Sequence, residues 1–247
     1  MTEIMVPYEY HGRQFEGAVV WDDSINTPRP IVFMQPDWYG VCRHTLDMAA
    51  EAAGPNYVML VADMYGVGYG EKAKEYDFLL ASAQGARRDL DLVREGGAIA
   101  LDALLKTARQ TAPVADTPLG AIGFCMGGGI VLEQARAGAD FAGTVVFHIT
   151  LPNPVDPKTE ARFTGKVLAL HGRVDPVTPK DMMDELEDEL SGAGVEWQTM
   201  TFSHATHAFC VRGENNPPYT LFDEEVCRKS FRMMHEFFEE TLSTQYQ

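Results

Sequence analysis

Residues Leu119–Gly129 read LGAIGFCMGGG, and this stretch decides how the rest of the chain is interpreted. An apolar segment, Leu119–Phe124, leads into a glycine cluster, and a helix-like run follows over Ile130–Ala139. Gly123–Gly127 is therefore a G-x-C-x-G pentapeptide at a predicted strand-to-helix corner. A nucleophile at such a corner sits on a sharp turn with its side chain exposed above the sheet. Glycine suits both flanking positions, because a Cβ there would clash with the strand or the helix.

Cys125 is the residue that this corner presents as a candidate nucleophile. Its predicted place at a helix N-terminus favours the thiolate, because that helix end carries a partial positive charge. The backbone N–H of Met126 follows at the same helix end, where it can donate to an oxyanion that develops beside the nucleophile. The alternative is a buried structural cysteine at a glycine-rich packing corner.

The overall composition fits one large α/β domain, and we expect a single domain over residues 1–247. A hydrophobic share of 45% provides for a sizeable core. No apolar run has the length of a membrane span, and the first residues, MTEIMVPYEYHG, lack the pattern of a signal peptide. The formal net charge of −16 argues against binding to nucleic acid or to an anionic membrane surface.

The cysteine pattern gives no sign of a disulfide scaffold. The four cysteines, which show no C-x-x-C spacing, are Cys42, Cys125, Cys210 and Cys227. A reducing cytoplasm is the simplest location for such a chain, and it would also keep a catalytic thiol reduced.

Hydrophobic patterning predicts strands and helices in alternation. Before the corner, the predicted strands are Ile4–Tyr10, Gln14–Trp21, Pro30–Met34 and Tyr57–Ala62, and the predicted helices are Cys42–Ala53, Glu71–Ala83 and Arg87–Gln110. After it come the strands Thr144–Ile149, Lys166–His171 and Glu196–Phe202 and the helices Lys180–Ala193 and Leu221–Leu242. The first two strands are expected to form a hairpin, and Gly96-Gly97 is expected to bend the third helix.

This alternation predicts the α/β class, with a mostly parallel central sheet covered by helices on both faces. No stretch is long enough for a large cap domain. The proline-rich segment Leu151–Lys158 is the one candidate for a small lid.

Two of the predicted strands lead into polar loops, and in a parallel sheet the site forms outside the carboxyl ends of the strands. Asp175 lies in the loop after one strand and His207 in the loop after the next. Cys125, Asp175 and His207 thus follow the order nucleophile, acid, histidine of an α/β-hydrolase triad. His207 would take the thiol proton and later protonate the leaving group, while Asp175 would hold the imidazole tautomer.

Each of these two assignments has a plainer alternative. Asp175 precedes Pro176 and can simply form a turn. His207 can be a loop histidine whose ring is bonded to backbone groups. His204, three residues before His207, could also compete as the base.

Several stretches together resemble the dienelactone hydrolase family. The three signature stretches are Gly123-Phe124-Cys125-Met126-Gly127-Gly128, His171-Gly172-Arg173-Val174-Asp175-Pro176 and His207-Ala208-Phe209, with further likeness in Asp37-Trp38-Tyr39-Gly40 and Ala62-Asp63-Met64-Tyr65-Gly66. The resemblance covers nearly the whole chain. It implies a single-domain α/β-hydrolase with a Cys-His-Asp triad that acts on lactones and related small esters without a cofactor.

The resemblance also implies roles for the loop after Met34. Asp37 stands where the family has a glutamate that touches the resting thiol and helps to activate it, so it would modulate Cys125. The alternative is that Asp37 caps the helix that follows. The backbone N–H of Trp38 matches the family's second oxyanion donor, and Tyr39 is a candidate substrate contact.

The same resemblance raises the question of substrate charge. The type member of the family binds a substrate carboxylate with arginines, one of them four residues after the catalytic histidine. That position is Val211 here, and Arg212 follows it. Arg212, Arg173 and His148 are therefore candidate substrate contacts, while Arg212 could equally be a surface charge and His148 a core residue.

A metal site is the main chemical alternative. Four histidines lie at or near predicted strand ends and could in principle hold zinc: His148, His171, His204 and His207. Ligand spacing on one element, such as H-E-x-x-H, is absent from the sequence. We therefore expect neither a metal nor a cofactor.

Three functions are compatible with a G-x-C-x-G corner. We expect an enzyme that hydrolyses a small ester or lactone. A class I glutamine amidotransferase would need a glutamate two residues after the histidine, and Phe209 stands there instead. A non-catalytic binding or thiol-sensing protein on the same fold is the remaining alternative, and the oligomeric state is not predicted.

Overall fold

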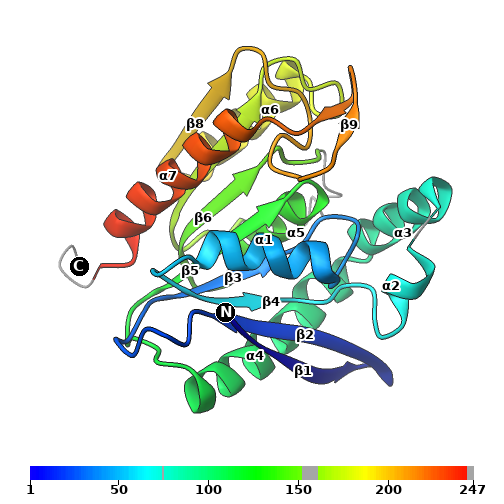
Figure 1. The fold of residues 1–247 in the computed structure, drawn as a ribbon. Helices are drawn as coiled ribbons and strands as arrows, with labels where there is room; N and C mark the ends of the chain where they lie inside the picture. The colour runs from blue at the N-terminus through cyan, green and yellow to red at the C-terminus, as the bar shows by residue number, and fades with distance from the viewer. Residues whose placement is uncertain (74, 152–160, 244–247) are drawn as a thin grey trace.

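A computed structural model describes residues 1–73, 75–151 and 161–243. Its central sheet has eight strands in the order β1-β2-β4-β3-β5-β6-β7-β8 (Figure 1). The strands are β1 (Thr2–Tyr10), β2 (Arg13–Trp21), β3 (Ile31–Gln35), β4 (Val58–Val61), β5 (Leu119–Phe124), β6 (Phe141–Phe147), β7 (Lys166–Gly172) and β8 (Trp197–Phe202). β1 and β2 are antiparallel to each other, β2 is antiparallel to β4, and β4, β3, β5, β6, β7 and β8 run parallel to one another. All of these parallel strands therefore end at the same edge of the sheet.

Helices cover both faces of this sheet. They are α1 (Arg43–Ala53), α2 (Tyr69–Lys72), α3 (Tyr76–Arg88), α4 (Gly97–Thr111), α5 (Met126–Arg136), α6 (Lys180–Gly192) and α7 (Glu224–Thr241). The buried side chains of α1 and α7 form one apolar cluster with the sheet, and those of α3, α4, α5 and α6 form a second cluster. The predicted α/β fold with helices on both faces is confirmed, and the chain segments described show no large cap domain.

The region before the central corner differs from the prediction in detail. The predicted helix Glu71–Ala83 is two helices, the short α2 and the longer α3. At Gly96-Gly97, where a bend was expected, a π-helical turn, η1 (Leu92–Gly96), runs directly into α4. The side chain of Gln134 enters here and donates from Nε2 to the Val93 carbonyl at 2.9 Å. A Cβ on Gly97 would collide with that same amide, so this glycine provides space for Gln134.

The long loop after β8 has more structure than the sequence indicated. β9 (Asn215–Asn216) and β10 (Thr220–Leu221) form a small hairpin within it. The proline-rich segment Leu151–Lys158, proposed above as a lid, lies almost wholly outside the described residues.

The cysteine pattern gave no sign of a disulfide scaffold, but the structure contains one disulfide. Cys210, three residues after His207, forms a disulfide with Cys227 in the first turns of α7. Cys42 and Cys125 are the two free cysteines. The pairing depends on how α7 packs against the loop after β8, which a count of cysteines does not reveal. The cysteine argument for a reducing compartment therefore loses its support. Among the helices described, none is both long and apolar enough to cross a membrane.

Candidate active site

Cys125 occupies the corner between β5 and α5. Its backbone has φ 53° and ψ −119°, a strained conformation for a residue with a side chain. The surrounding backbone holds it there: the Cys125 N–H donates to the Phe147 carbonyl at 3.0 Å, and the Cys125 carbonyl accepts from Thr150 N–H at 3.0 Å. A Cβ at Gly123 or Gly127 would overlap backbone atoms of neighbouring segments. The two glycines are thus required by close approach, as the sequence predicted.

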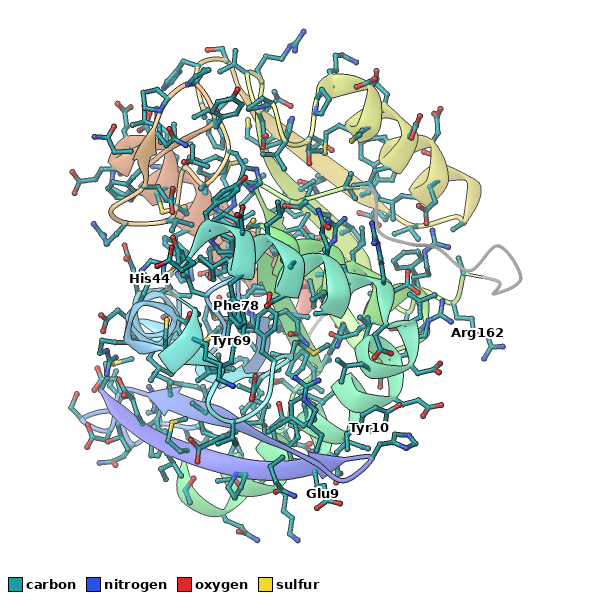
Figure 2. All side chains as sticks on the ribbon, turned by 90° about the vertical axis from the view of Figure 1, so that its right-hand side faces the viewer. Glu9, Tyr10, His44, Tyr69, Phe78 and Arg162 are labelled. Atoms are coloured by element: carbon teal, nitrogen blue, oxygen red, sulfur yellow. A yellow bond between two sulfur atoms is a disulfide. The ribbon has the colours of Figure 1, made fainter. Side chains whose placement is uncertain are left out.

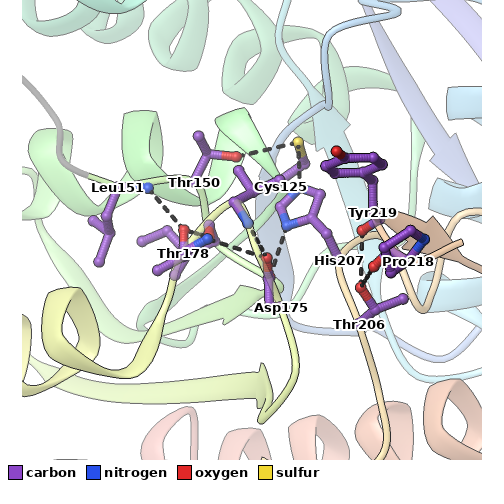
Figure 3. A network of polar contacts seen from close by, with 11 residues as sticks. Cys125, Thr150, Leu151, Asp175, Thr178, Thr206, His207, Pro218 and Tyr219 are labelled. Atoms are coloured by element: carbon purple, nitrogen blue, oxygen red, sulfur yellow. Dashed lines mark hydrogen bonds and ion pairs between the residues drawn. The ribbon is translucent and has the colours of Figure 1, made fainter.

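The structure brings Cys125, His207 and Asp175 together (Figure 3). His207 Nε2 lies 3.0 Å from Cys125 Sγ, and His207 Nδ1 lies 2.8 Å from Asp175 Oδ2. Asp175 also forms the turn that was its alternative role, because Oδ1 accepts from Val177 N–H at 2.7 Å and Thr178 N–H at 3.1 Å. One carboxylate oxygen therefore fixes the loop, and the other fixes the imidazole. His204 is at the surface, 3.2 Å from Asp223, and does not approach the thiol.

The charges of Cys125 and Asp175 favour a protonated imidazole on His207 between them. Burial acts to lower the pKa of His207, but the charge of Cys125 and the hydrogen bond that His207 donates to Asp175 outweigh it and raise the pKa above its usual value. Because its pKa is raised, His207 stays protonated through neutral pH. The positive charge of its imidazolium then stabilises a thiolate at Cys125.

Thr150 is a contact of the thiol that the sequence analysis missed. Its Oγ1 lies 3.3 Å from Cys125 Sγ. Thr178 holds the segment that carries Thr150, since its Oγ1 donates to the Ile149 carbonyl at 2.7 Å and accepts from Leu151 N–H at 3.1 Å (Figure 3). The usable signal was its position: Thr150 directly follows the predicted strand Thr144–Ile149, at the edge of the sheet where sites form.

The two predicted oxyanion donors lie at the same cavity as the thiol. Met126 begins α5, so its N–H has no acceptor within the helix. Tyr69 OH donates to the Trp38 carbonyl at 2.8 Å, and Tyr65 OH contacts Met126 Sδ at 3.0 Å. The rings of Tyr65 and Tyr69 stack at 3.9 Å, and Figure 2 shows Tyr69 close to Phe78, on which it stacks in turn. An aromatic stack thus supports both residues whose N–H groups are the candidate donors.

The cavity above the thiol has a volume of about 480 Å³. Apolar side chains make up much of its wall, among them Trp38, Tyr76, Leu79, Leu80, Ala83, Val177 and Val211. Its charged lining residues in the described part of the chain are Asp37, Arg87, His207 and Glu214 in addition to the thiol. Arg87 and Glu214 carried no motif and were not predicted.

A model of the dienelactone hydrolase family matches residues 15–242. The chain belongs to the dienelactone hydrolase family. A curated relative from Bradyrhizobium sp., a probable 2-oxo-3-(5-oxofuran-2-ylidene)propanoate lactonase, is 26% identical over 188 residues, which is 73% of either chain. The solved structure of m3DLH is 29% identical, with a TM-score of 0.86 over 98% of this chain and 99% of that one. A dienelactone hydrolase-like promiscuous phosphotriesterase from metagenomic libraries is 30% identical, with a TM-score of 0.84 over 98% and 99%.

Membership of this family confirms the predicted class of enzyme, a hydrolase of carboxylic esters or lactones. The roles of individual residues rest on the geometry of this chain, which departs from the family pattern at several of the predicted positions.

Asp37 has partners other than the thiol. Its Oδ1 accepts from Tyr39 N–H at 3.0 Å, and its Oδ2 lies 3.6 Å from Nε2 of His44. The nearby carboxylate of Asp37 raises the pKa of His44, against the effect of burial. The alternative role as a helix cap is wrong, because Cys42 is the N-cap of α1 and no side chain caps it. Asp37 is a turn-forming residue with an ion-pair partner on α1.

The predicted arginine contacts do not reach the cavity. Arg212 forms an ion pair with Glu51, with Nη2 and Oε1 2.8 Å apart, and its guanidinium lies over the Phe222 ring. Arg173 is exposed and is absent from the cavity lining. Val211, at the position of the family arginine, lines the cavity instead.

His148 lies behind the site. Its side chain is fully buried, and its ring packs edge-on against His207 and Phe209, with centroid distances of 5.4 Å and 4.9 Å. Burial, together with the charge of His207, lowers its pKa. Its contact is therefore with the catalytic candidate His207. Tyr39, in contrast, does line the cavity.

In the described part of the chain, the structure shows no group of three or more His, Cys, Asp or Glu side chains arranged for a metal ion. Of the four histidines considered for zinc, His204 lies at the surface, and His148, His171 and His207 are buried.

Proposed function

We propose that this protein hydrolyses a small carboxylic ester or lactone with Cys125 as nucleophile, His207 as general acid and base, and Asp175 as the residue that orients His207. The observation that carries this proposal is the row of contacts from Cys125 Sγ to His207 Nε2 at 3.0 Å and from His207 Nδ1 to Asp175 Oδ2 at 2.8 Å. The row starts on a strained corner and lies beside a cavity of about 480 Å³.

In the first half of the reaction, the Cys125 thiolate attacks the carbonyl carbon, and the π electron pair moves to the carbonyl oxygen. The N–H groups of Met126 and Trp38 are the proposed donors to this oxyanion. When the tetrahedral intermediate collapses, the C–O bond to the leaving group breaks and His207 gives its proton to the departing alkoxide. A thioester on Cys125 results. With a lactone, the alcohol remains attached to the acyl group.

In the second half, neutral His207 removes a proton from a water molecule that attacks the thioester. The C–S bond breaks, the thiolate is restored beside the imidazolium, and the carboxylic acid leaves. Asp175 keeps the imidazole in the tautomer that presents Nε2 to both reactions. Thr150 donates its hydroxyl hydrogen to the thiolate and so helps to hold it in place between turnovers.

A small substrate fits both the cavity and the nucleophile. A thiolate is a good leaving group as well as a good nucleophile, so a thiol enzyme suits strained or activated acyl donors such as lactones and enol esters. The net charge of −16 supports a small-molecule substrate and no nucleic-acid partner.

The experiment that tests the proposal measures turnover of p-nitrophenyl acetate and of a panel of lactones by the wild type and by Cys125→Ala. We expect turnover in the wild type and its loss in the variant. Cys42→Ala, which removes the other free cysteine, is the matched control and should retain turnover. If iodoacetamide labels Cys125 but no ester or lactone is hydrolysed, the protein is a thiol sensor or binder instead.

A further inference from the structure

One wall of the cavity carries a carboxylate that the proposed reaction does not use. Glu214 directly precedes β9 in the loop that also carries His207, and it lines the same cavity as Cys125. Its backbone is fixed on both sides, because Glu214 N–H donates to the Val211 carbonyl at 3.2 Å and its carbonyl accepts from Phe222 N–H at 3.0 Å. The carboxylate is therefore a built part of the wall.

Both oxygens of Glu214 are held by neutral groups. Oε1 accepts from Tyr39 OH at 3.1 Å, and Oε2 accepts from Thr220 Oγ1 at 2.7 Å. Among the described residues, no lysine or arginine forms an ion pair with Glu214. Hydroxyl donors orient a carboxylate but bring no positive charge to offset its negative charge. This wall therefore presents a negative charge to whatever enters.

The neighbouring groups are consistent with that charge. Burial, and then the charge of Glu214, raises the pKa of Tyr39 to about 12, so Tyr39 stays a neutral donor. Asp37 also lines the cavity, with its charge directed toward His44. The arginine nearest in sequence, Arg212, is bound to Glu51 outside the cavity.

We propose that Glu214 determines the charge selectivity of the cavity, so that the substrate is an ester or lactone whose group at the Tyr39–Glu214–Thr220 wall is neutral or positively charged. This inference rests on the proposed function. A substrate carboxylate at this wall would face Glu214 in a partly desolvated cavity, where like charges repel more strongly than in water. Arg87, on α3, lines the same cavity and donates to the Thr150 carbonyl at 3.4 Å. An anionic group is therefore acceptable only away from Glu214.

The test compares kcat/KM for two matched pairs of substrates. One pair differs by a carboxylate in the acyl part, mono-p-nitrophenyl glutarate against p-nitrophenyl butyrate. The other differs by a carboxylate in the leaving group, 4-acetoxybenzoate against phenyl acetate. In Glu214→Gln, we expect the anionic-to-neutral ratio of at least one pair to rise about 10-fold, the scale of one close charge pair in a partly buried site.

Glu51→Gln is the matched control, because it removes the same charge from the surface of α1, where Glu51 pairs with Arg212 of the loop that carries Glu214. Its ratios should stay within about 2-fold of the wild type, since exposed charges are screened. Salt gives a second readout, which needs only the wild type. If Glu214 repels the anionic substrate of one pair, 0.5 M NaCl should raise the anionic-to-neutral ratio of kcat/KM for that pair. The rise should be smaller for a pair on which Glu214 does not act.

Three results would overturn the inference. Unchanged ratios for both pairs in Glu214→Gln, with neutral esters still hydrolysed, would show that Glu214 does not select by charge. An equal rise in Glu51→Gln would assign the effect to overall charge. Failure of the wild type to hydrolyse any of the four esters would remove the proposed function and this inference together.

Discussion

The two ends of the cavity differ in how they are built. At the proposed catalytic end, Cys125 directly follows β5, Asp175 and His207 lie in the loops after β7 and β8, and contacts of 3.0 Å or less join the three side chains. At the recognition end, Tyr39 and Glu214 come from loops, and the family arginine position is a valine. Since Asp175 and His207 also lie in loops, the two ends differ in their contacts: the proposed catalytic groups bind one another, whereas at the recognition end Glu214 is bound by the hydroxyl groups of Tyr39 and Thr220.

The largest expected effect is at the nucleophile. Cys125→Ala removes the only group proposed to attack the carbonyl carbon, so kcat should fall by at least about 10⁴-fold. The fold should be retained, because alanine is smaller and the strained backbone is held by neighbouring segments. Circular dichroism and thermal unfolding check the fold. Near-normal turnover would remove the nucleophile assignment.

Asp175→Asn should have the next largest effect. The amide can hold His207 in the wrong tautomer, and kcat should fall by about 10²–10⁴-fold. The loop itself should survive, because the retained carbonyl oxygen can still accept from Val177 and Thr178. A loss smaller than about 10-fold would contradict the role given to Asp175.

The pH dependence of Cys125 alkylation probes the raised pKa of His207. The imidazolium supports the thiolate below that pKa and is lost as the pH rises through it. Alkylation by iodoacetamide should therefore be rapid and nearly constant between about pH 7 and 8.5, whereas an ordinary thiol reacts increasingly over this range because its pKa is about 8.5. A rate that climbs steadily through this range would contradict the ion pair.

Thr150→Val should have a smaller effect, because one hydrogen bond to the thiolate is lost while the shape is kept. We expect kcat/KM to fall about 10-fold, with alkylation at pH 7 slowed as well. Thr150→Ser keeps a hydroxyl and should restore most of both rates. If serine and valine behave alike, Thr150 acts through packing and not through its hydroxyl.

Asp37→Asn should have the smallest effect on the thiol. Since the carboxylate is bound to Tyr39 N–H and lies beside His44, we expect alkylation of Cys125 to change by less than about 2-fold. Clearly faster alkylation in the variant would instead support the role in restraining the thiol that the family resemblance implied.

Most of the fold and of the catalytic end could be predicted from the sequence, because local rules determine them. The G-x-C-x-G corner requires glycines at Gly123 and Gly127, and alternating apolar segments identify the strands whose ends carry Asp175 and His207. The strands and Gly123 depend on the chain close to each position, whereas Gly127 is also required by the close approach of the Gln35 and Pro36 carbonyls.

The recognition end could not be predicted, because it depends on how distant segments pack. The direction of Arg212 is set by Glu51 and Phe222, and the partner of Asp37 is His44 on α1. The Cys210–Cys227 disulfide depends in the same way on the packing of α7. Thr150 and Glu214 belong to no motif; Thr150 is marked in the sequence only by its position after a predicted strand, and Glu214 becomes visible only through its contacts.

The most direct test of the central claim is a titration of Cys125 with iodoacetamide in the Cys42→Ala background. Turnover of p-nitrophenyl acetate and the fraction of Cys125 alkylated, measured by mass spectrometry, are followed in the same samples. The account predicts that turnover falls in proportion to Cys125 labelling and that substrate slows both. Full turnover in protein whose Cys125 is completely alkylated would contradict it.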